Sequence, residues 1–132
     1  MVIPRFVELA LMGEPITIYG DGTQSRCFTD VLDATEAMIL VMENANTVGE
    51  IFNIGNTEEI SINQLACRIA ELTDSSSEIR YVPYEKVYGS KFEDMRRRVP
   101  DISKIKHFTR WEPQIKTDEI LRRVIESYRN NH

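Results

Sequence analysis

Apolar residues recur at helical spacing along much of the chain, and each such stretch predicts a helix. The predicted helices, in chain order, are residues 2 to 12 ending at Gly13, residues 31 to 45 capped by Asp30 or Asp33, a helix opened by a capping box at Ser61 to Gln64, a short helix from Asp101 or Ser103 to Phe108, and a last helix capped by Thr117 or Asp118. The helix at 31 to 45 is apolar through more than a full turn, at Met38 to Met42. A helix apolar on nearly all sides is buried on nearly all sides, so this one needs a covering surface beyond what a domain this small supplies.

Shorter apolar runs predict strands. The predicted strands are Ile16 to Tyr19, Glu50 to Gly55 and Ile79 to Val82. The first of them runs into the turn Gly20-Asp21-Gly22, and a short extended piece follows at Cys27 to Thr29. Pro83 to Asp94 is expected to be irregular. The fold class is therefore α/β: a small mixed domain of short strands and about four to five helices.

Length and composition indicate an ordinary globular protein. The 132 residues form most simply one domain, 1 to 132, with a hydrophobic content of 42%. Cys27 and Cys67 lie forty positions apart with no histidine near either, so we expect two reduced thiols and no metal site. No apolar run is long enough to cross a bilayer, and no leader pattern follows Met1. We expect a cytoplasmic protein without a membrane partner.

The charges are unevenly distributed around a net charge of −5. Between Arg26 and Arg68 the chain has seven acidic residues and no Lys or Arg, whereas Lys91 to Arg110 is mainly basic. An acidic protein with one basic segment suits a local anion site. Nucleic-acid binding through Arg96, Arg97 and Arg98 is not expected, because the remaining acidic surface would repel phosphates.

The sequence lacks several motifs that an enzyme active on its own would use to bind a cofactor or to catalyse a reaction. The only Gly-x-Gly is Gly20-Asp21-Gly22, with Ser25 at the third fingerprint position and no long helix predicted to follow, so the dinucleotide-binding unit is missing. The sequence has no Gly-x-Ser-x-Gly, no phosphate-binding Gly-Lys-Ser/Thr loop and no Tyr-x-x-x-Lys pair. His107 and His132 do not have metal-ligand spacing. No catalytic residue is predicted in this chain.

Two arginines are candidates for binding an anion. Arg26 follows the glycine turn, and Arg98 precedes Asp101 across a segment stiffened by proline. Two fixed guanidinium groups suit a diphosphate, because the planar fork grips oxygens in pairs, and the nearby acid could accept hydrogen bonds from ribose hydroxyls. The alternative, which composition alone favours, is that these arginines form ion pairs with Asp30, Asp33 or Asp101.

Aromatic residues flank the same turn. Tyr19 precedes it and Phe28 follows it. Aromatic residues at strand ends more often lie in the core or at its rim than under a nucleobase, although stacking on a base is physically available. Asp21 is most simply a turn former.

Four motifs in this order carry a resemblance to a known family. They are Val2-Ile3-Pro4-Arg5-Phe6, the stretch Gly13 to Phe28, Phe52-Asn53-Ile54-Gly55-Asn56, and Arg98-Val99-Pro100-Asp101-Ile102-Ser103-Lys104. Together they resemble the C-terminal, substrate-binding part of the NAD-dependent epimerase/dehydratase family, the extended short-chain dehydrogenases that act on nucleotide sugars. The closest resemblance is to UDP-glucuronate decarboxylases and dTDP-glucose dehydratases.

The resemblance implies a role for each matching position. Thr17 and Tyr19 would contact the nucleobase, Arg26 would hold the diphosphate, and Phe28 would lie on the ribose side. Ile62 would pack against the nucleotide. Arg98 would supply a second phosphate contact and Asp101 a contact to the ribose or beside the phosphate. The substrate implied is a UDP- or dTDP-sugar.

The resemblance also implies what this chain lacks. Family members begin with an NAD-binding half and use a Tyr-x-x-x-Lys pair to move the proton. Both would precede Met1, so NAD is expected in a full-length parent, none is expected here, and the isolated chain is expected to be inactive. The helix at 31 to 45 would then pack on the missing half. The alternative is a non-catalytic interaction module that uses this helix to form a homo-oligomer or to dock on a partner.

Overall fold

A computed structural model describes residues 1–88 and 94–130. The chain divides into two compact units. The first unit contains residues 1–26, 60–97 and 121–132, and the second contains residues 27–59 and 98–120. The expectation of one domain over the whole chain stays a prediction. The predicted class of a small mixed α/β fold is confirmed.

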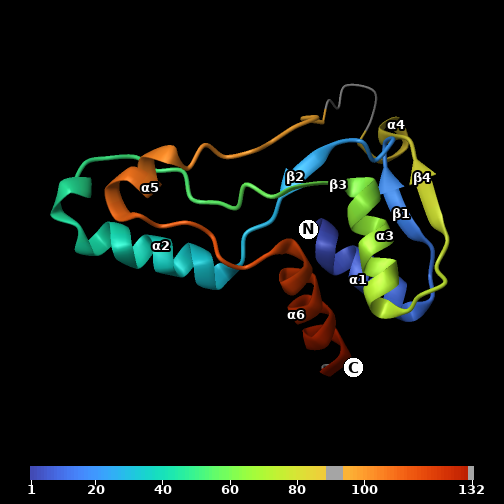
Figure 1. Ribbon diagram of the computed structural model, residues 1–132. Coiled ribbons are helices and arrows are strands. Elements are labelled where there is room, and N and C mark those ends of the chain that lie inside the picture. The colour runs from blue at the N-terminus through green and yellow to red at the C-terminus, as the bar shows by residue number, and fades with distance from the viewer. Residues whose placement is uncertain (89–93, 131–132) are drawn as a thin grey trace. The chain divides into compact units, whose positions relative to one another are not determined.

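The first unit is built on two parallel strands and the helices that pack on them (Figure 1). Strand β1 (Ile16–Tyr19) pairs with β4 (Ile79–Val82), with Ile16 opposite Ile79 and Tyr19 opposite Val82. Helices α1 (Val2–Met12) and α3 (Ile62–Thr73) pack on each other and on β1. The alternation in β1 turns Ile16 and Ile18 into the core, where both are fully buried, and leaves the side chains between them half-buried.

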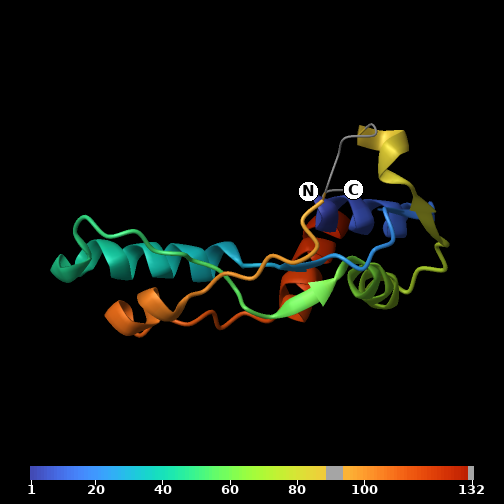
Figure 2. The same cartoon turned by 90° about the horizontal axis from the view of Figure 1, so that it is seen from above.

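The core of the first unit is aliphatic apart from one phenylalanine. Its largest fully buried side chains are Phe6, Val7, Ile16, Ile18, Leu65, Ile69 and Leu121. The last of these comes from helix α6 (Thr117–Asn130), whose part from Leu121 onward belongs to this unit and lies beside α1 (Figures 1 and 2). Helix α1 ends where the sequence predicts, because Gly13 adopts the left-handed conformation with φ 71° that favours glycine.

The predicted capping box at the start of α3 is confirmed. The Ser61 hydroxyl oxygen accepts the backbone N–H of Gln64 at 3.1 Å, and the Gln64 side chain accepts the N–H of Ser61 at 3.0 Å. We expect Ser61→Ala to lower the free energy of unfolding by about 1 kcal/mol, because the first turn of α3 loses an acceptor. Urea denaturation measures this change, and Ser76→Ala, at an exposed loop position, should leave stability unchanged. Equal effects of the two substitutions would show that the box does not stabilise α3.

The second unit packs around a tryptophan. Helices α2 (Val31–Glu43) and α5 (Ser103–Thr109) lie side by side in Figure 2, with a short 3-10 helix, η1 (Ala45–Thr47), after α2. Ala37, Ile105 and Trp111 are buried together, and Phe52 packs against them. Phe52 also meets the ring of Phe108 edge to face at 5.4 Å between centroids.

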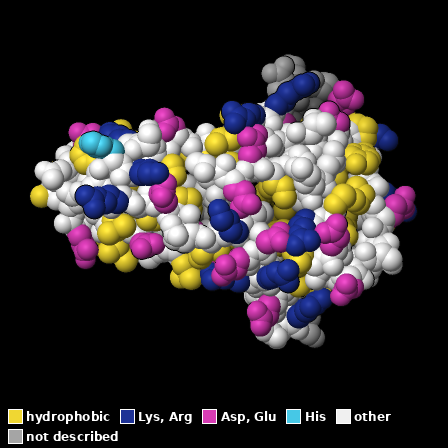
Figure 3. Space-filling model, in the orientation of Figure 1, with side chains coloured by type: hydrophobic (Ala, Val, Ile, Leu, Met, Phe, Trp, Pro, Cys, Tyr) yellow, Lys and Arg dark blue, Asp and Glu magenta, His cyan; other side chains and the backbone are white. Residues whose placement is uncertain are grey.

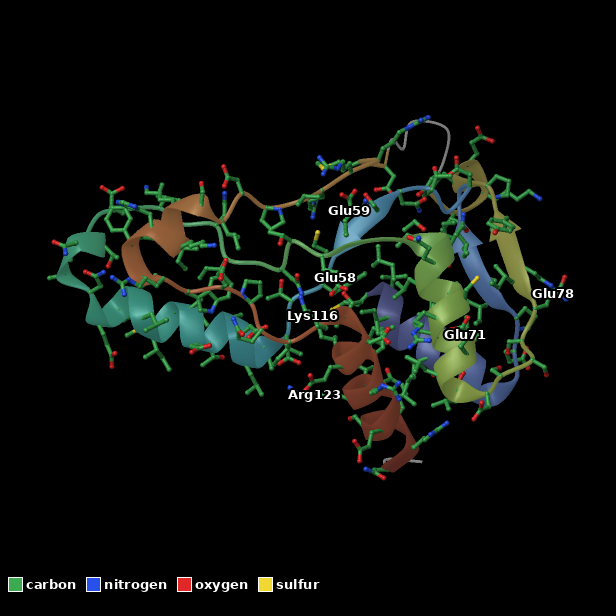
Figure 4. The ribbon with its side chains drawn as sticks, in the orientation of Figure 1. Glu58, Glu59, Glu71, Glu78, Lys116 and Arg123 are labelled. Carbon is green, nitrogen blue, oxygen red and sulfur yellow. The ribbon has the colours of Figure 1, made fainter. Side chains whose placement is uncertain are left out.

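Three acidic side chains hold the backbone of the second unit. Asp30 caps α2 by accepting the N–H of Leu32 at 2.9 Å, whereas Asp33, the alternative cap, is buried and accepts the backbone N–H groups of Gln114 and Ile115 at 2.9–3.1 Å. Glu58, labelled in Figure 4, accepts both the N–H and the hydroxyl of Thr117 at 2.9 Å. The Glu58 carboxylate, from a distant segment, therefore lies at the first residue of α6. A negative charge at a helix N-terminus interacts favourably with the helix dipole and stabilises the helix.

Some of the predicted elements are wrong. Glu50 to Gly55 forms no strand, because Phe52 and Ile54 pack on the tryptophan cluster instead of joining a sheet. The short extended piece lies two residues earlier than predicted, as β2 (Ser25–Cys27), and it pairs with an unpredicted strand, β3 (Glu59–Ser61). The segment predicted as irregular, Pro83 to Asp94, contains helix α4 (Tyr84–Tyr88), and its residues 89–93 lie outside the described residues.

Helix α2 has the exposed apolar surface that its sequence implies. Within this chain the exposed side chains are Val31, Leu32, Met38, Ile39 and Met42. Hydrophobic side chains gather along α2 in Figure 3. The burial predicted for this helix on nearly all sides is therefore not provided by the described residues of this chain. Among those residues no helix combines the length and the apolar character needed to cross a membrane.

Candidate functional site

The turn after β1 has two glycines that a larger residue could not replace without a clash. Gly20 and Gly22 have φ values of 77° and 72°. A Cβ atom on Gly20 would lie 2.2 Å from the Tyr84 ring, and one on Gly22 would lie 2.0 Å from the Asn63 side-chain oxygen. Asp21 is the predicted turn former: its carboxylate accepts the N–H and the hydroxyl of Thr23 at 2.9 and 2.7 Å. These hydrogen bonds lower the pKa of Asp21.

A pocket of about 360 Å³ lies in the first unit beside this turn. It is lined by Met1, Val2, Arg5, Phe6, Tyr19, Gln24, Arg26, Ile62, Tyr84 and Asp94. Helix α1 supplies one wall, the turn between β1 and β2 supplies a second, and the start of α3 contributes Ile62. The lining joins apolar and aromatic surface to two arginines and one acid.

Arg26 is held by an acid and by backbone carbonyl groups. Its Nη2 donates to Asp94 at 2.6 Å, and its Nη1 donates to the carbonyl oxygens of Ser25 and Met95, both at 2.7 Å. The side chains of this ion pair are only 20% and 25% exposed. An ion pair was one of the two interpretations of Arg26, and its partner here is Asp94 and not one of the three acids considered from the sequence.

Asp94 continues the hydrogen-bond chain to the turn. The hydroxyl of Tyr84 donates to Asp94 Oδ2 at 2.7 Å. Gln24 Nε2 donates to the same hydroxyl at 2.7 Å and to the carbonyl oxygen of Tyr19 at 3.2 Å. Partial burial, followed by the hydrogen bond to Asp94, raises the pKa of Tyr84, so this phenol stays protonated and remains a donor.

Arg5 supports the aromatic face of the pocket. Its guanidinium carbon lies 4.1 Å from the centre of the Tyr19 ring, and its Nη2 donates to the carbonyl oxygen of Thr17 at 2.7 Å. A cation over the ring orients Tyr19 and ties α1 to β1. Sequence reasoning missed Arg5 as a site residue, although it belongs to the first of the four motifs.

The structure brings three of the seven predicted site residues into one pocket: Tyr19, Arg26 and Ile62. Thr17 does not line it and contributes only the carbonyl group that Arg5 binds. Besides the apolar residues of α1 and Met1, the other pocket residues that sequence reasoning missed are Gln24, Tyr84 and Asp94. Gln24 could have been suspected because it lies within the second motif, whereas no sequence signal marks the other two.

The remaining predicted residues, Phe28, Arg98 and Asp101, belong to the second unit. Phe28 is half-buried and Arg98 is exposed. Asp101 accepts the N–H of Ser103 at 2.9 Å at the start of α5, and hydrogen bonds from Ser103 lower its pKa. This agrees with the prediction that α5 begins at Asp101 or Ser103. The roles of these three residues toward a ligand stay predictions.

The Gly-x-Gly turn does not have the structure of a dinucleotide-binding turn. The single Gly-x-Gly forms the turn from β1 to β2, and no helix N-terminus follows it to receive a pyrophosphate. We therefore derive no chemical step through NAD from this chain. The described residues, with 89–93 and 131–132 left aside, contain no group of three or more His, Cys, Asp or Glu side chains that could hold a metal ion.

Comparison with known proteins places this fold in a class. The family model of GDP-mannose 4,6 dehydratase matches residues 1–124. The UDP-N-acetyl-alpha-D-glucosaminuronate decarboxylase of Bacillus cytotoxicus is 45% identical over 128 residues, which are 97% of this chain and 40% of that protein. The chain thus spans well under half the length of this relative.

Solved structures give the same result. The UDP-glucose 4-epimerase of Thermotoga maritima, solved with UDP-glucose, superposes with a TM-score of 0.87 at 32% identity, over 99% of this chain and 40% of that one. The UDP-glucuronic acid 4-epimerase of Bacillus cereus, solved with UDP-glucuronic acid and NAD, has a TM-score of 0.88 at 25% identity, over 100% of this chain and 40% of that one.

Fold and relatives place the chain in a family of nucleotide-sugar-modifying enzymes. The chain belongs to the GDP-mannose 4,6 dehydratase family, among the NAD-dependent epimerases and dehydratases that its four motifs resemble. The resemblance inferred from the sequence is confirmed.

Proposed function

We propose that this chain binds the nucleoside diphosphate of a UDP-sugar, as the substrate-binding portion of an NAD-dependent nucleotide-sugar enzyme. The observation that carries the proposal is that Tyr19 and Arg26, from the stretch Gly13 to Phe28, line one pocket together with the distant Ile62. Its volume of about 360 Å³ falls within the range of small-molecule sites.

The pocket has the chemistry that this ligand requires. The Tyr19 ring and Ile62 offer apolar surface to a planar base, and Arg5 holds the ring in place. Arg26 offers a guanidinium group to the phosphate oxygens, which it can bind in pairs. Uracil is preferred to thymine in this proposal because the relatives compared above are named for UDP-sugars.

Among the reactions of the family, we favour decarboxylation of a UDP-sugar acid. The support is the 45% identity to a decarboxylase, against 32% and 25% to the two epimerases. The hydride and proton transfers would use NAD and a Tyr-x-x-x-Lys pair, neither of which these 132 residues provide. We therefore expect the isolated chain to bind ligand without turning it over, and turnover of a UDP-sugar by the purified chain with added NAD would contradict this.

Titration of the chain with UDP, followed by calorimetry or amide shifts, tests the binding proposal. We expect saturable binding, and Arg26→Ala should weaken it by about tenfold or more, because a charge-assisted contact to phosphate is lost. The matched control is Arg80→Ala, which removes an arginine from an exposed ion pair with Glu78 outside the pocket. It should leave the affinity for UDP unchanged. Absence of UDP binding by the folded, unsubstituted 132-residue chain would reject the proposed function.

The alternative of a non-catalytic interaction module rests on the exposed apolar surface of α2. It is not favoured, because the relatives are nucleotide-sugar enzymes over the whole length of this chain. The same surface suits the predicted packing of α2 on an NAD-binding half.

A further inference from the structure

We propose that Asp94 is an internal competitor for the Arg26 guanidinium, which a ligand phosphate must displace, so that Asp94 sets the affinity of the pocket for diphosphates. This inference rests on the proposed function, because it assumes that Arg26 receives the phosphate. Asp94 would then be a residue that determines specificity, not a structural partner of an arginine.

The geometry supports competition because the ion pair lies inside the pocket. Both Arg26 and Asp94 line it, and the 2.6 Å contact occupies Nη2, one of the guanidinium nitrogens that a phosphate could bind. A phosphate beside Arg26 would also lie close to the Asp94 carboxylate, and like charges at that separation repel. A ligand phosphate and Asp94 would therefore compete for Arg26.

The structure also provides a place for the displaced carboxylate. A second pocket of about 450 Å³ adjoins the first, and Gln24, Tyr84 and Asp94 line both. Arg96, two residues along the chain, lines this second pocket. Asp94 could therefore exchange Arg26 for Arg96 by a local movement of its own segment.

The contacts of Asp94 and of the residues that follow it make such a movement local. On the far side, Ser25 donates its N–H to the carbonyl oxygen of Arg96 at 2.8 Å, and Ser25 forms a parallel bridge with Arg97, so this end of the segment is held to β2. On the pocket side, Asp94 is held by the hydroxyl of Tyr84 and by Arg26. Binding of phosphate to Arg26 would remove one of these two contacts.

The change in affinity for a diphosphate depends on the fraction of molecules in which Arg26 is paired with Asp94. When only a fraction of molecules has the binding-competent arrangement, the apparent dissociation constant rises by the inverse of that fraction. A pair that is formed in about nine tenths of molecules would weaken diphosphate binding about tenfold. Uridine, which has no phosphate, should bind equally well whether or not the pair is formed.

The experiment compares UDP and uridine titrations of the 132-residue chain and of Asp94→Asn. Asparagine keeps the size and the acceptor but loses the charge, so we expect about tenfold tighter UDP binding and unchanged uridine binding. Tyr84→Phe, which removes a hydrogen bond from Asp94 and keeps the ring, should change UDP binding in the same direction by a smaller factor. The matched control is Glu78→Gln, which neutralises an acid paired with Arg80 outside the pocket (Figure 4) and should change neither affinity.

The outcomes separate this inference from the proposed function. If the unsubstituted chain binds UDP and Asp94→Asn binds UDP equally well or more weakly, the inference is overturned and the proposed function stands. A parallel change in uridine and UDP affinities means a structural role for Asp94 and also overturns it. No UDP binding by any folded variant rejects both. If Asp94→Asn does not fold, equal UDP binding by Tyr84→Phe and the parent overturns the inference.

Discussion

Replacing Asp33 with alanine is expected to lower the free energy of unfolding by about 2–4 kcal/mol, because two backbone N–H groups lose a charged acceptor in a buried site. The Asp33 residue is only 3% exposed, and its two oxygens accept the N–H groups of Gln114 and Ile115 at 2.9–3.1 Å. Alanine would leave both N–H groups without this partner. Equilibrium denaturation in urea, followed by circular dichroism, measures the loss.

Two further variants define the cause of that loss. Asp33→Asn keeps one carbonyl acceptor in the same place, so its cost should be clearly smaller than that of alanine. Glu36→Ala removes an exposed acid from the same helix and should change stability by less than about 0.5 kcal/mol. Equal stabilities of the Asp33→Ala and Glu36→Ala proteins would contradict the role assigned to Asp33.

The parts of the fold that the sequence predicts are those determined by neighbouring residues. The capping box at Ser61, the stop at Gly13 and the alternation from Ile16 to Tyr19 each depend on contacts within a few positions, and all three are present. The predicted strand at Glu50 to Gly55 is wrong because an apolar run of that length fits a strand and a packed coil equally well. Contact with Trp111, about sixty positions away, decides between them.

The candidate site shows the same division between local and distant information. Local sequence places Arg26 just after a glycine turn, and the family resemblance adds Tyr19 and Ile62, which do line the same pocket. Asp94 could not be predicted, since its contact with Arg26 joins residues 68 positions apart. An acid in a charged segment has no local mark that distinguishes it from its neighbours, and only the folded chain selects it.

Gly20 is required both by the local backbone conformation of the turn and by contact with the distant Tyr84 ring. Gly20→Ala is therefore expected to lower the free energy of unfolding by about 2–4 kcal/mol. About 1 kcal/mol comes from placing a Cβ atom at a positive φ, and about 1–3 kcal/mol comes from overpacking. The new Cβ atom would lie 2.2 Å from the Tyr84 ring, so this ring has to move away from Gln24 and Asp94. Urea denaturation gives the stability, and the ring resonances of Tyr84 report its displacement.

Gly13 separates the two contributions, because it has nearly the same φ, 71° against 77°, and an added Cβ atom there would meet nothing within 4 Å. Gly13→Ala should therefore cost only the conformational part, about 1 kcal/mol. In a Tyr84→Ala background, Gly20→Ala should fall to the same cost, since the clashing ring is gone and the two effects are not additive. An undiminished cost of Gly20→Ala in that background would mean that the turn itself, and not the contact with Tyr84, requires glycine.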